Sequence, residues 1–195
     1  APSSPRQAPA QPARRLAPQR LIAVYTEGSA RASPDTRRER AGLAGVGGHT
    51  RRMELYIVRH AIAEPRGAGW PDAERPLTLK GIERLERVVS GLKALDVELD
   101  AVFHSPWRRA IETAERLTPL MGRPRRVELE ALAAPPGKEL LRGLRGERIA
   151  AVGHEPWMGE LCAWLVTGDP DLGDRFPFKK AGVAMLEGTP EPGGC

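Results

Sequence analysis

Three short polar segments of the sequence carry side chains that could act together on an anion. Arg59 and His60 follow the apolar run MELYIV, residues 105–109 follow AVF, and His154 comes soon after RIAAV. Guanidinium groups bind phosphate oxygens in bidentate geometry, and imidazoles act as nucleophiles or proton carriers near neutral pH. Two arginines and two histidines brought together would therefore form a site for a phosphoryl group.

The elements around these segments follow the pattern of an α/β protein. Short apolar runs bounded by polar or turn residues predict strands at 53–58, 101–103, 127–129, 148–152 and 183–187. Helical periodicity and capping residues predict helices at 79–96, 106–117, 138–144 and 155–165. Strands that alternate with helices predict a three-layer sandwich, in which helices cover both faces of a mainly parallel sheet.

This architecture explains how the three segments could meet. The carboxyl ends of parallel strands form the ligand crevice of an open α/β sheet. Helix starts expected at Ser105 and Glu155 would add backbone N–H groups and favourable dipoles to an anion site there.

The same segments resemble the motifs of the histidine phosphatase superfamily. IVRHAIAEP at 57–65 resembles its Arg-His-Gly or Arg-His-Ala signature. SPWRRA at 105–110, followed by Thr113, resembles Ser-Pro-x-x-Arg-Ala-x-x-Thr, and VGHEP at 152–156 resembles the second histidine motif. RPLT at 75–78 with Gly81 is similar to the phosphohistidine phosphatase branch. The resemblance covers roughly 53–187 and implies a phosphoglycerate mutase-like fold.

The resemblance also implies a role for each motif residue. His60 would be the nucleophile and would form a phosphohistidine intermediate, which suits a neutral imidazole flanked by fixed cations. Arg59, Arg109 and His154 would bind the phosphoryl group, with Ser105 beside them, and the motif selects Arg109 over Arg108. We expect His154 to act in its protonated form, as a donor to the phosphoryl oxygens.

The general acid is less clearly marked. Many members of the superfamily use a glutamate to protonate the leaving oxygen, and Glu130, near the end of the third expected strand, is the candidate for that role. Asp72 and Glu74 are alternatives.

These features predict an enzyme that hydrolyses phosphohistidine on a protein. The alternatives are a small-metabolite phosphomonoesterase or mutase of the same superfamily, and a non-catalytic phosphate-binding module. The partner would be a phosphorylated protein or a small phosphate ester. No cofactor or metal is expected, because the second histidine of an H-E-x-x-H zinc motif begun at His154 would fall on Met158.

Several other residues allow two interpretations each. Arg108 would be an exposed helix residue or a second phosphate contact, and His104 a structural residue or part of the pocket lining. Lys179 and Lys180 would be a solvated charge pair or a basic pocket rim. Trp107, Trp157 and Trp164 would belong to the core or the pocket wall, and Cys162 would be buried.

Charge is distributed unevenly along the 195 residues. Residues 1–52 hold ten arginines, no lysine and three acids, a net charge of +7, whereas 53–195 hold 20 basic and 22 acidic residues, a net charge of −2. We therefore interpret 1–52 as a disordered basic leader, 53–187 as the phosphatase domain and 188–195 as a flexible tail. A nucleic-acid partner is not expected, nor is a membrane span, and two cysteines fit a cytoplasmic protein.

Overall fold

The computed structural model describes the backbone of residues 20–25 and the whole of residues 52–195, whose strands form one six-stranded sheet. The strands are β1 (Arg20–Tyr25), β2 (Met53–Arg59), β3 (Ala101–His104), β4 (Arg126–Glu128), β5 (Arg148–Gly153) and β6 (Val183–Gly188). Their order is β1-β6-β2-β5-β3-β4. The strands β2, β5, β3 and β4 are parallel, and β6 runs antiparallel to both β2 and β1.

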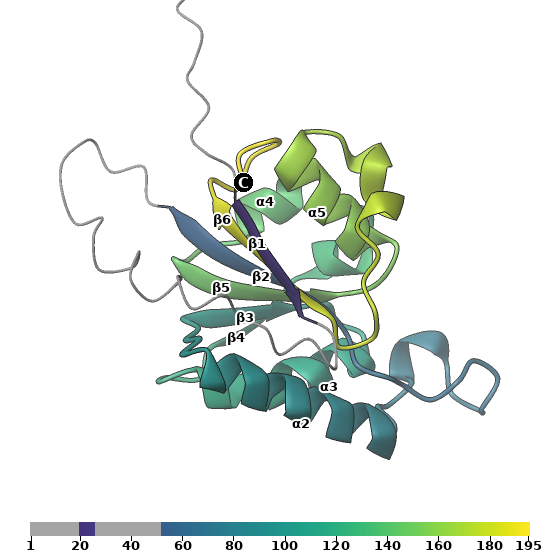
Figure 1. Ribbon diagram of the computed structural model, residues 1–195. Coiled ribbons are helices and arrows are strands. Elements are labelled where there is room, and N and C mark those ends of the chain that lie inside the picture. The colour runs from purple at the N-terminus through teal and green to yellow at the C-terminus, as the bar shows by residue number, and fades with distance from the viewer. Residues whose placement is uncertain (1–19, 26–51) are drawn as a thin grey trace, which may run out of the picture.

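Helices cover both faces of the sheet. The longer helices are α2 (Leu79–Ala94), α3 (Arg108–Arg116), α4 (Lys138–Gly143) and α5 (Trp157–Thr167). Short 3-10 segments are η1 (Asp72–Glu74), η2 (Thr118–Leu120), η3 (Glu130–Ala133) and η4 (Pro170–Arg175). In Figure 1, α2 and α3 lie on one side of the sheet and α4 and α5 on the other. The expected three-layer sandwich is therefore confirmed.

The alternation of side chains along β2 separates two hydrophobic cores. Tyr56 and Val58 face the core shared with α2 and α3, whereas Leu55 and Ile57 face the core shared with α4 and α5. This is the period of two that a strand imposes on its side chains. Burial on both faces explains why β2 is a nearly continuous apolar run.

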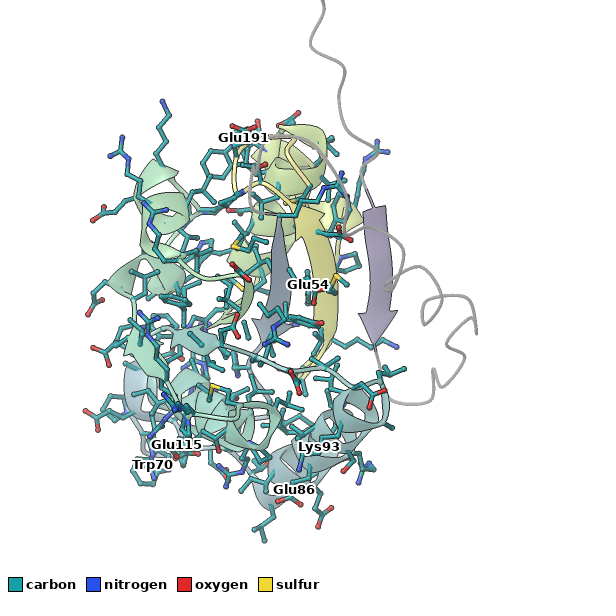
Figure 2. The ribbon with its side chains drawn as sticks, turned by 90° about the vertical axis from the view of Figure 1, so that its left-hand side faces the viewer. Glu54, Trp70, Glu86, Lys93, Glu115 and Glu191 are labelled. Atoms are coloured by element: carbon teal, nitrogen blue, oxygen red, sulfur yellow. The ribbon has the colours of Figure 1, made fainter. Side chains whose placement is uncertain are left out.

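Helix α2 follows from its capping residue and its apolar stripe. The Thr78 side chain accepts a hydrogen bond from the Gly81 N–H at 3.0 Å, as expected of an N-cap. The buried Leu85, Val89 and Leu92 recur every three or four residues on the face toward the sheet. Glu86 and Lys93 point away from the sheet in Figure 2.

Helix α3 begins later than the sequence predicts. The expected start had Ser105 as N-cap, but the helix begins at Arg108, with Trp107 in the capping position. Ser105 Oγ instead accepts a hydrogen bond from the Trp107 N–H at 3.2 Å, which closes a turn before the helix. Ser105 is therefore held at the end of β3 and not in a helix.

Two predictions about the chain ends are corrected. Arg20–Tyr25 was expected to be disordered, but it forms β1, because the outer edge of β6 offers backbone groups that an apolar segment can pair with. Figure 2 shows β1 beside β6 at the edge of the sheet. The rest of residues 1–51 lies outside the described residues. The predicted flexible tail is also wrong: Cys195 is buried, and its N–H donates to Leu165 O at 3.0 Å.

Within the described part of the chain, no helix combines the length and the apolar character needed to cross a membrane.

Candidate active site

The three polar segments meet at the carboxyl edge of the parallel strands. Arg59, the last residue of β2, pairs with Gly153 of β5, and His104 of β3 pairs with Val152 of β5. Residues 60, 105 and 154 each follow one of these neighbouring strand ends. In Figure 1 the loop after β2 projects from this edge of the sheet. The predicted convergence is therefore present in the fold.

His60 is buried and held in a single orientation. Its N–H donates to Gly153 O at 3.0 Å, and its side-chain Nδ1 lies 2.7 Å from Ala61 O. Because a carbonyl oxygen can only accept, Nδ1 carries the proton and Nε2 carries the lone pair. That lone pair is the one a nucleophile needs.

Arg109 supplies a cation next to that lone pair. Its Nε lies 3.2 Å from His60 Nε2, and its side chain is nearly fully buried. Asp72 of η1 fixes the other end of the guanidinium, with Asp72 O 2.5 Å from Nη1 and Oδ2 3.4 Å from Nη2. The guanidinium also lies 4.4 Å from the Trp107 ring centroid. The buried cation is thus both paired and oriented.

Arg59 is anchored by the segment before β6. Its Nη1 donates to Phe178 O at 2.5 Å, and the Phe178 N–H in turn donates to Glu155 Oε1 at 2.5 Å. The buried Arg59 Nε has no hydrogen-bond partner among the described residues. A buried guanidinium N–H without a partner is expensive, so this donor is available to a phosphoryl oxygen.

His154 lies beside His60, with ring centroids 5.0 Å apart. Its Nε2 is 2.8 Å from Ser105 Oγ, and its buried Nδ1 has no partner within the described part of the chain. Trp107 and Trp157 pack around its ring, at centroid distances of 4.3 and 6.1 Å. These two tryptophans therefore line the site, whereas Trp164 packs against the α4 and α5 core.

The electrostatics of the site favour the neutral form of both histidines. Burial lowers the pKa of His60 to about 2, with the charges of Lys180, the neighbouring His154 and Arg109 acting in the same direction. Burial, followed by Arg109 and Lys180, lowers the pKa of His154 to about 3. The protonated form expected of His154 is therefore disfavoured by these surroundings alone. An arriving phosphate dianion would raise both pKa values, because opposite charge favours protonation.

Lys180 lies at the site, in agreement with the second interpretation of the lysine pair, that of a basic pocket rim. Its Nζ lies 3.0 Å from His60 Nε2, whereas the side chain of Lys179 is exposed. The two lysines are thus not one solvated pair. Because β6 is antiparallel to β2, its amino end lies at the carboxyl edge of the parallel strands. The antiparallel direction of β6 brings the residues just before it to the site. The sequence pattern alone does not show this direction.

The three candidate acids have different surroundings. Glu130 is exposed at the start of η3, which follows β4. The same segment approaches the end of β5, because Leu132 O would lie 3.2 Å from a Cβ added to Gly153. Burial acts to raise the pKa of Asp72, but hydrogen bonds from Arg66 and Arg75 and the Arg109 charge lower it overall, so this carboxylate is ionised. Glu74 is exposed. Glu130 therefore stays the predicted acid.

The neighbouring polar residues divide into positioning and peripheral groups. Thr113 accepts from the Ala61 N–H at 3.1 Å and donates to Arg109 O at 2.6 Å, which ties α3 to the residue after the nucleophile. His104 is buried, with Nδ1 3.0 Å from Ser105 O. Arg108 is exposed and pairs with Glu112 at 2.7 Å. No group of three or more metal-binding side chains occurs in the described ranges.

The fold and this site together define an α/β phosphoryl-transfer enzyme built around two histidines and two arginines. Residues 55–134 match the model of the histidine phosphatase superfamily (branch 1). The chain is 31% identical over 125 residues to the phosphohistidine phosphatase SixA of Escherichia coli (strain K12), covering 60% of this chain and 76% of that protein. The chain belongs to the histidine phosphatase superfamily.

Solved structures agree with this assignment. The protein histidine phosphatase SixA in complex with tungstate has a TM-score of 0.55 and 28% identity, covering 68% of this chain and 86% of that one. A phosphoglycerate mutase from Plasmodium falciparum has a TM-score of 0.50 and 16% identity, with coverage of 72% and 86%. The second likeness concerns the fold alone, which is phosphoglycerate mutase-like.

Proposed function

We propose that this enzyme removes the phosphoryl group from phosphohistidine on proteins, through a covalent phosphohistidine intermediate on His60. The observation that carries the covalent step is the Nε2 lone pair of His60, oriented by the 2.7 Å contact between Nδ1 and Ala61 O and placed 3.2 Å from Arg109 Nε. The similarity to the phosphohistidine phosphatase of E. coli supports the choice of substrate.

In the first step His60 Nε2 attacks the phosphorus. A new N–P bond forms on His60 while the P–N bond to the substrate imidazole breaks, and that imidazole leaves with the bonding electron pair and a proton. Arg59, Arg109 and His154 stabilise the negative charge on the phosphoryl oxygens. The protonated imidazole is a good leaving group, so this substrate depends less on an enzyme acid than an alkyl ester does.

In the second step water attacks the phosphorus of the intermediate. The His60 N–P bond breaks, inorganic phosphate is released, and Nε2 regains its lone pair. Because the pKa of His60 is lowered to about 2, the empty enzyme returns to the neutral form that can attack again. Glu130 is the candidate to take the proton of the water and to supply the proton in the first step.

The rim of the site supports a protein as the substrate. Trp70 is 43% exposed, and the Arg108 guanidinium lies 5.3 Å from its ring centroid. Asp72, two residues further on, holds the catalytic Arg109. Exposed tryptophan and arginine side chains are the types that dominate binding energy at protein interfaces. Figure 2 shows Trp70 at the surface of the molecule.

A comparison of substrates tests the proposal. We expect a higher kcat/KM for a phosphohistidine protein than for phosphoglycerates, sugar phosphates or aryl phosphates. His60→Ala should abolish turnover, and wild-type enzyme quenched during turnover should carry acid-labile phosphate. A preference for one metabolite would instead identify a phosphomonoesterase or mutase, and tight phosphate binding without turnover would identify a binding module. A phosphorylated protein as partner, no cofactor and a cytoplasmic location stay predictions.

Trp70→Ala separates the protein substrate from small ones. It should raise KM for the phosphohistidine protein several-fold while leaving kcat/KM for an aryl phosphate unchanged, because the exposed Trp70 ring packs against the surface residue Arg108. Equal effects on both substrates would show that the surface around Trp70 and Arg108 does not bind the protein substrate.

A further inference from the structure

Lys180 reaches the nucleophilic atom of the site. Its Nζ lies 3.0 Å from His60 Nε2, the nitrogen that Arg109 Nε approaches to 3.2 Å. Nε2 carries a lone pair because Nδ1 donates to Ala61 O. An ammonium and a guanidinium can only donate hydrogen bonds, so both converge on that lone pair. A phosphoryl group bonded to Nε2 must therefore enter the space between these two cations.

The backbone fixes Lys180 relative to His60. In the turn before β6, the Gly182 N–H donates to Lys179 O at 2.7 Å, and Ala181 takes a left-handed φ of 59°. The Ala181 N–H donates to His60 O at 3.2 Å, and the Arg59 N–H donates to Gly182 O at 3.0 Å. The turn is thus hydrogen-bonded to both residues of the nucleophile motif. These hydrogen bonds hold the backbone at Lys180 next to His60, and its side chain then brings Nζ to Nε2.

The charges around Lys180 set the pH range in which it is a cation. Burial lowers its pKa to about 8, assisted by nearby arginines and opposed by Glu155. The charged and titratable groups that face it are Arg59, His60, Arg75, Arg109, His154 and Glu155. At pH 7 the ammonium form predominates, and above pH 8 the site loses one positive charge.

We propose that Lys180 is a catalytic residue that binds a non-bridging phosphoryl oxygen during transfer to and from His60. This inference rests on His60 being the nucleophile of the proposed function. The leaving group departs on the side of phosphorus opposite to Nε2, whereas Lys180 stands beside Nε2. Its contact is therefore with the oxygens of the transferring group, and not with the leaving atom.

The role requires no proton transfer from Lys180. As the N–P bond forms at His60 and the bond to the leaving group breaks, negative charge remains on the three non-bridging oxygens. The ammonium donates a hydrogen bond to one of them, and Arg109 donates to another. When water later displaces Nε2, the same contacts hold the released phosphate.

Kinetics of matched lysine variants test the assignment. Lys180→Met should lower kcat/KM by about 10² to 10³, the usual loss for one donor to a developing oxyanion. Lys180→Arg should retain more activity, and Lys179→Met should stay within twofold of wild type, because the Lys179 side chain is exposed. Across aryl phosphates of increasing leaving-group pKa, the Lys180→Met loss should be constant. A loss that grows with leaving-group pKa would make Lys180 a general acid, and wild-type rates would remove it from the site.

Tungstate binding gives a readout that does not depend on turnover. The affinity of the wild-type enzyme for tungstate, measured calorimetrically, should fall between pH 7 and pH 9. The Lys180→Arg variant should show a smaller fall, and the Lys180→Met variant should bind weakly at both pH values. Near-ultraviolet circular dichroism checks that each variant is folded. If tungstate binding depends on Lys180 but the enzyme turns over no phosphorylated substrate, the proposed function is rejected and the role of Lys180 in oxyanion binding stands. Full His60-dependent turnover with lysine-independent binding would reject only the role of Lys180.

Discussion

Arg108 and Arg109 are adjacent residues of α3 with opposite surroundings. Arg109 is buried between Asp72, Trp107 and His60, whereas Arg108 is exposed and contacts Glu112 and Trp70. The first turn of α3 therefore places Arg109 in the candidate site and Arg108 at the surface.

Substitution of these two arginines should have very different effects. Arg109→Ala should lower kcat/KM by about 10² to 10³, because it removes a charge-assisted donor next to the reacting nitrogen. Arg108→Ala should change the rate on a small aryl phosphate by less than threefold. Steady-state kinetics of both variants checks this, and a larger effect at Arg108 would reverse the assignment.

The two neutral histidines should give the protein an acid-sensitive stability. Their pKa values in the folded state, about 2 and about 3, lie below the unfolded value near 6.5. The unfolded chain therefore binds more protons between those limits, and stability is lost as pH falls below 6.5. Each histidine contributes at most about 1.4 kcal/mol per pH unit in that window.

Titration by NMR and urea unfolding at pH 7 and pH 5 test this prediction together. The imidazole resonances of His60 and His154 should not titrate between pH 8 and pH 5. The free energy of unfolding should fall over the same interval, and His60→Asn should reduce the fall. A midpoint near pH 6.5 for either folded-state imidazole would contradict the prediction. Bound tungstate should raise both pKa values.

At the residue scale, the sequence located the motif histidines and arginines but left Lys180 between a solvated charge pair and a pocket rim. His60 and His154 directly follow strands, Arg59 ends a strand, and Arg109 lies in the helix after another, and strand ends are visible as the limits of apolar runs. Lys180 precedes a strand, so its place depends on β6 being antiparallel, which an apolar run does not reveal. The sequence also does not show that the surroundings lower the pKa of His154, because that effect depends on burial and on charges distant in sequence.

At the scale of elements, the first turn of α2 stands against the nucleophile loop. A Cβ added to Gly81 would overlap with the carbonyl oxygen of Ile62, two residues after His60. The Thr78 N–H also donates to Ile62 O at 2.9 Å. The start of α2 thus supports the backbone that follows the nucleophile.

Two glycines of α2 offer a matched test of that support. Gly81→Ala should destabilise the protein by about 1–3 kcal/mol through overpacking, and should lower kcat by displacing the loop after His60. Gly91→Ala, in the same helix with open space around it, should stabilise by about 0.5–1 kcal/mol and leave kcat unchanged. Urea unfolding and steady-state rates check both. If the two variants have the same stability and the same kcat, the contact between Gly81 and Ile62 does not hold the loop after His60 in place.

The order of elements was easier to predict than their ends. Periodicity and capping indicated α2 and its Thr78 cap, because both signals depend only on residues three or four positions apart. The start of α3 was misjudged, because Ser105 hydrogen-bonds to the next turn and also contacts His154 from another strand. The strand β1 was not predicted, since six residues with few apolar neighbours become a strand only by pairing with β6.

At the scale of the whole molecule, β1 protects the outer edge of the sheet. A chain that begins at Met53 should lose this strand and expose the backbone groups of β6, which favours self-association. Its Tm should fall, while kcat/KM per folded molecule should be unchanged, because none of the residues assigned to the site comes from β1. A chain that begins at Arg20 is the control. Identical Tm and sedimentation of the two chains would show that β1 has no protective role.

The sheet order also sets the sequence of events during synthesis on the ribosome. Among the described strands, β6 is the last in the chain, and it lies between β1 and β2, the first two. Newly made β1 and β2 must therefore leave a gap that is filled only when residues 183–188 emerge. The same late segment brings Phe178 to Arg59 and Lys180 to His60. A nascent chain would hold the nucleophile long before it held these partners, so phosphatase activity should appear only after residues 178–188 have emerged.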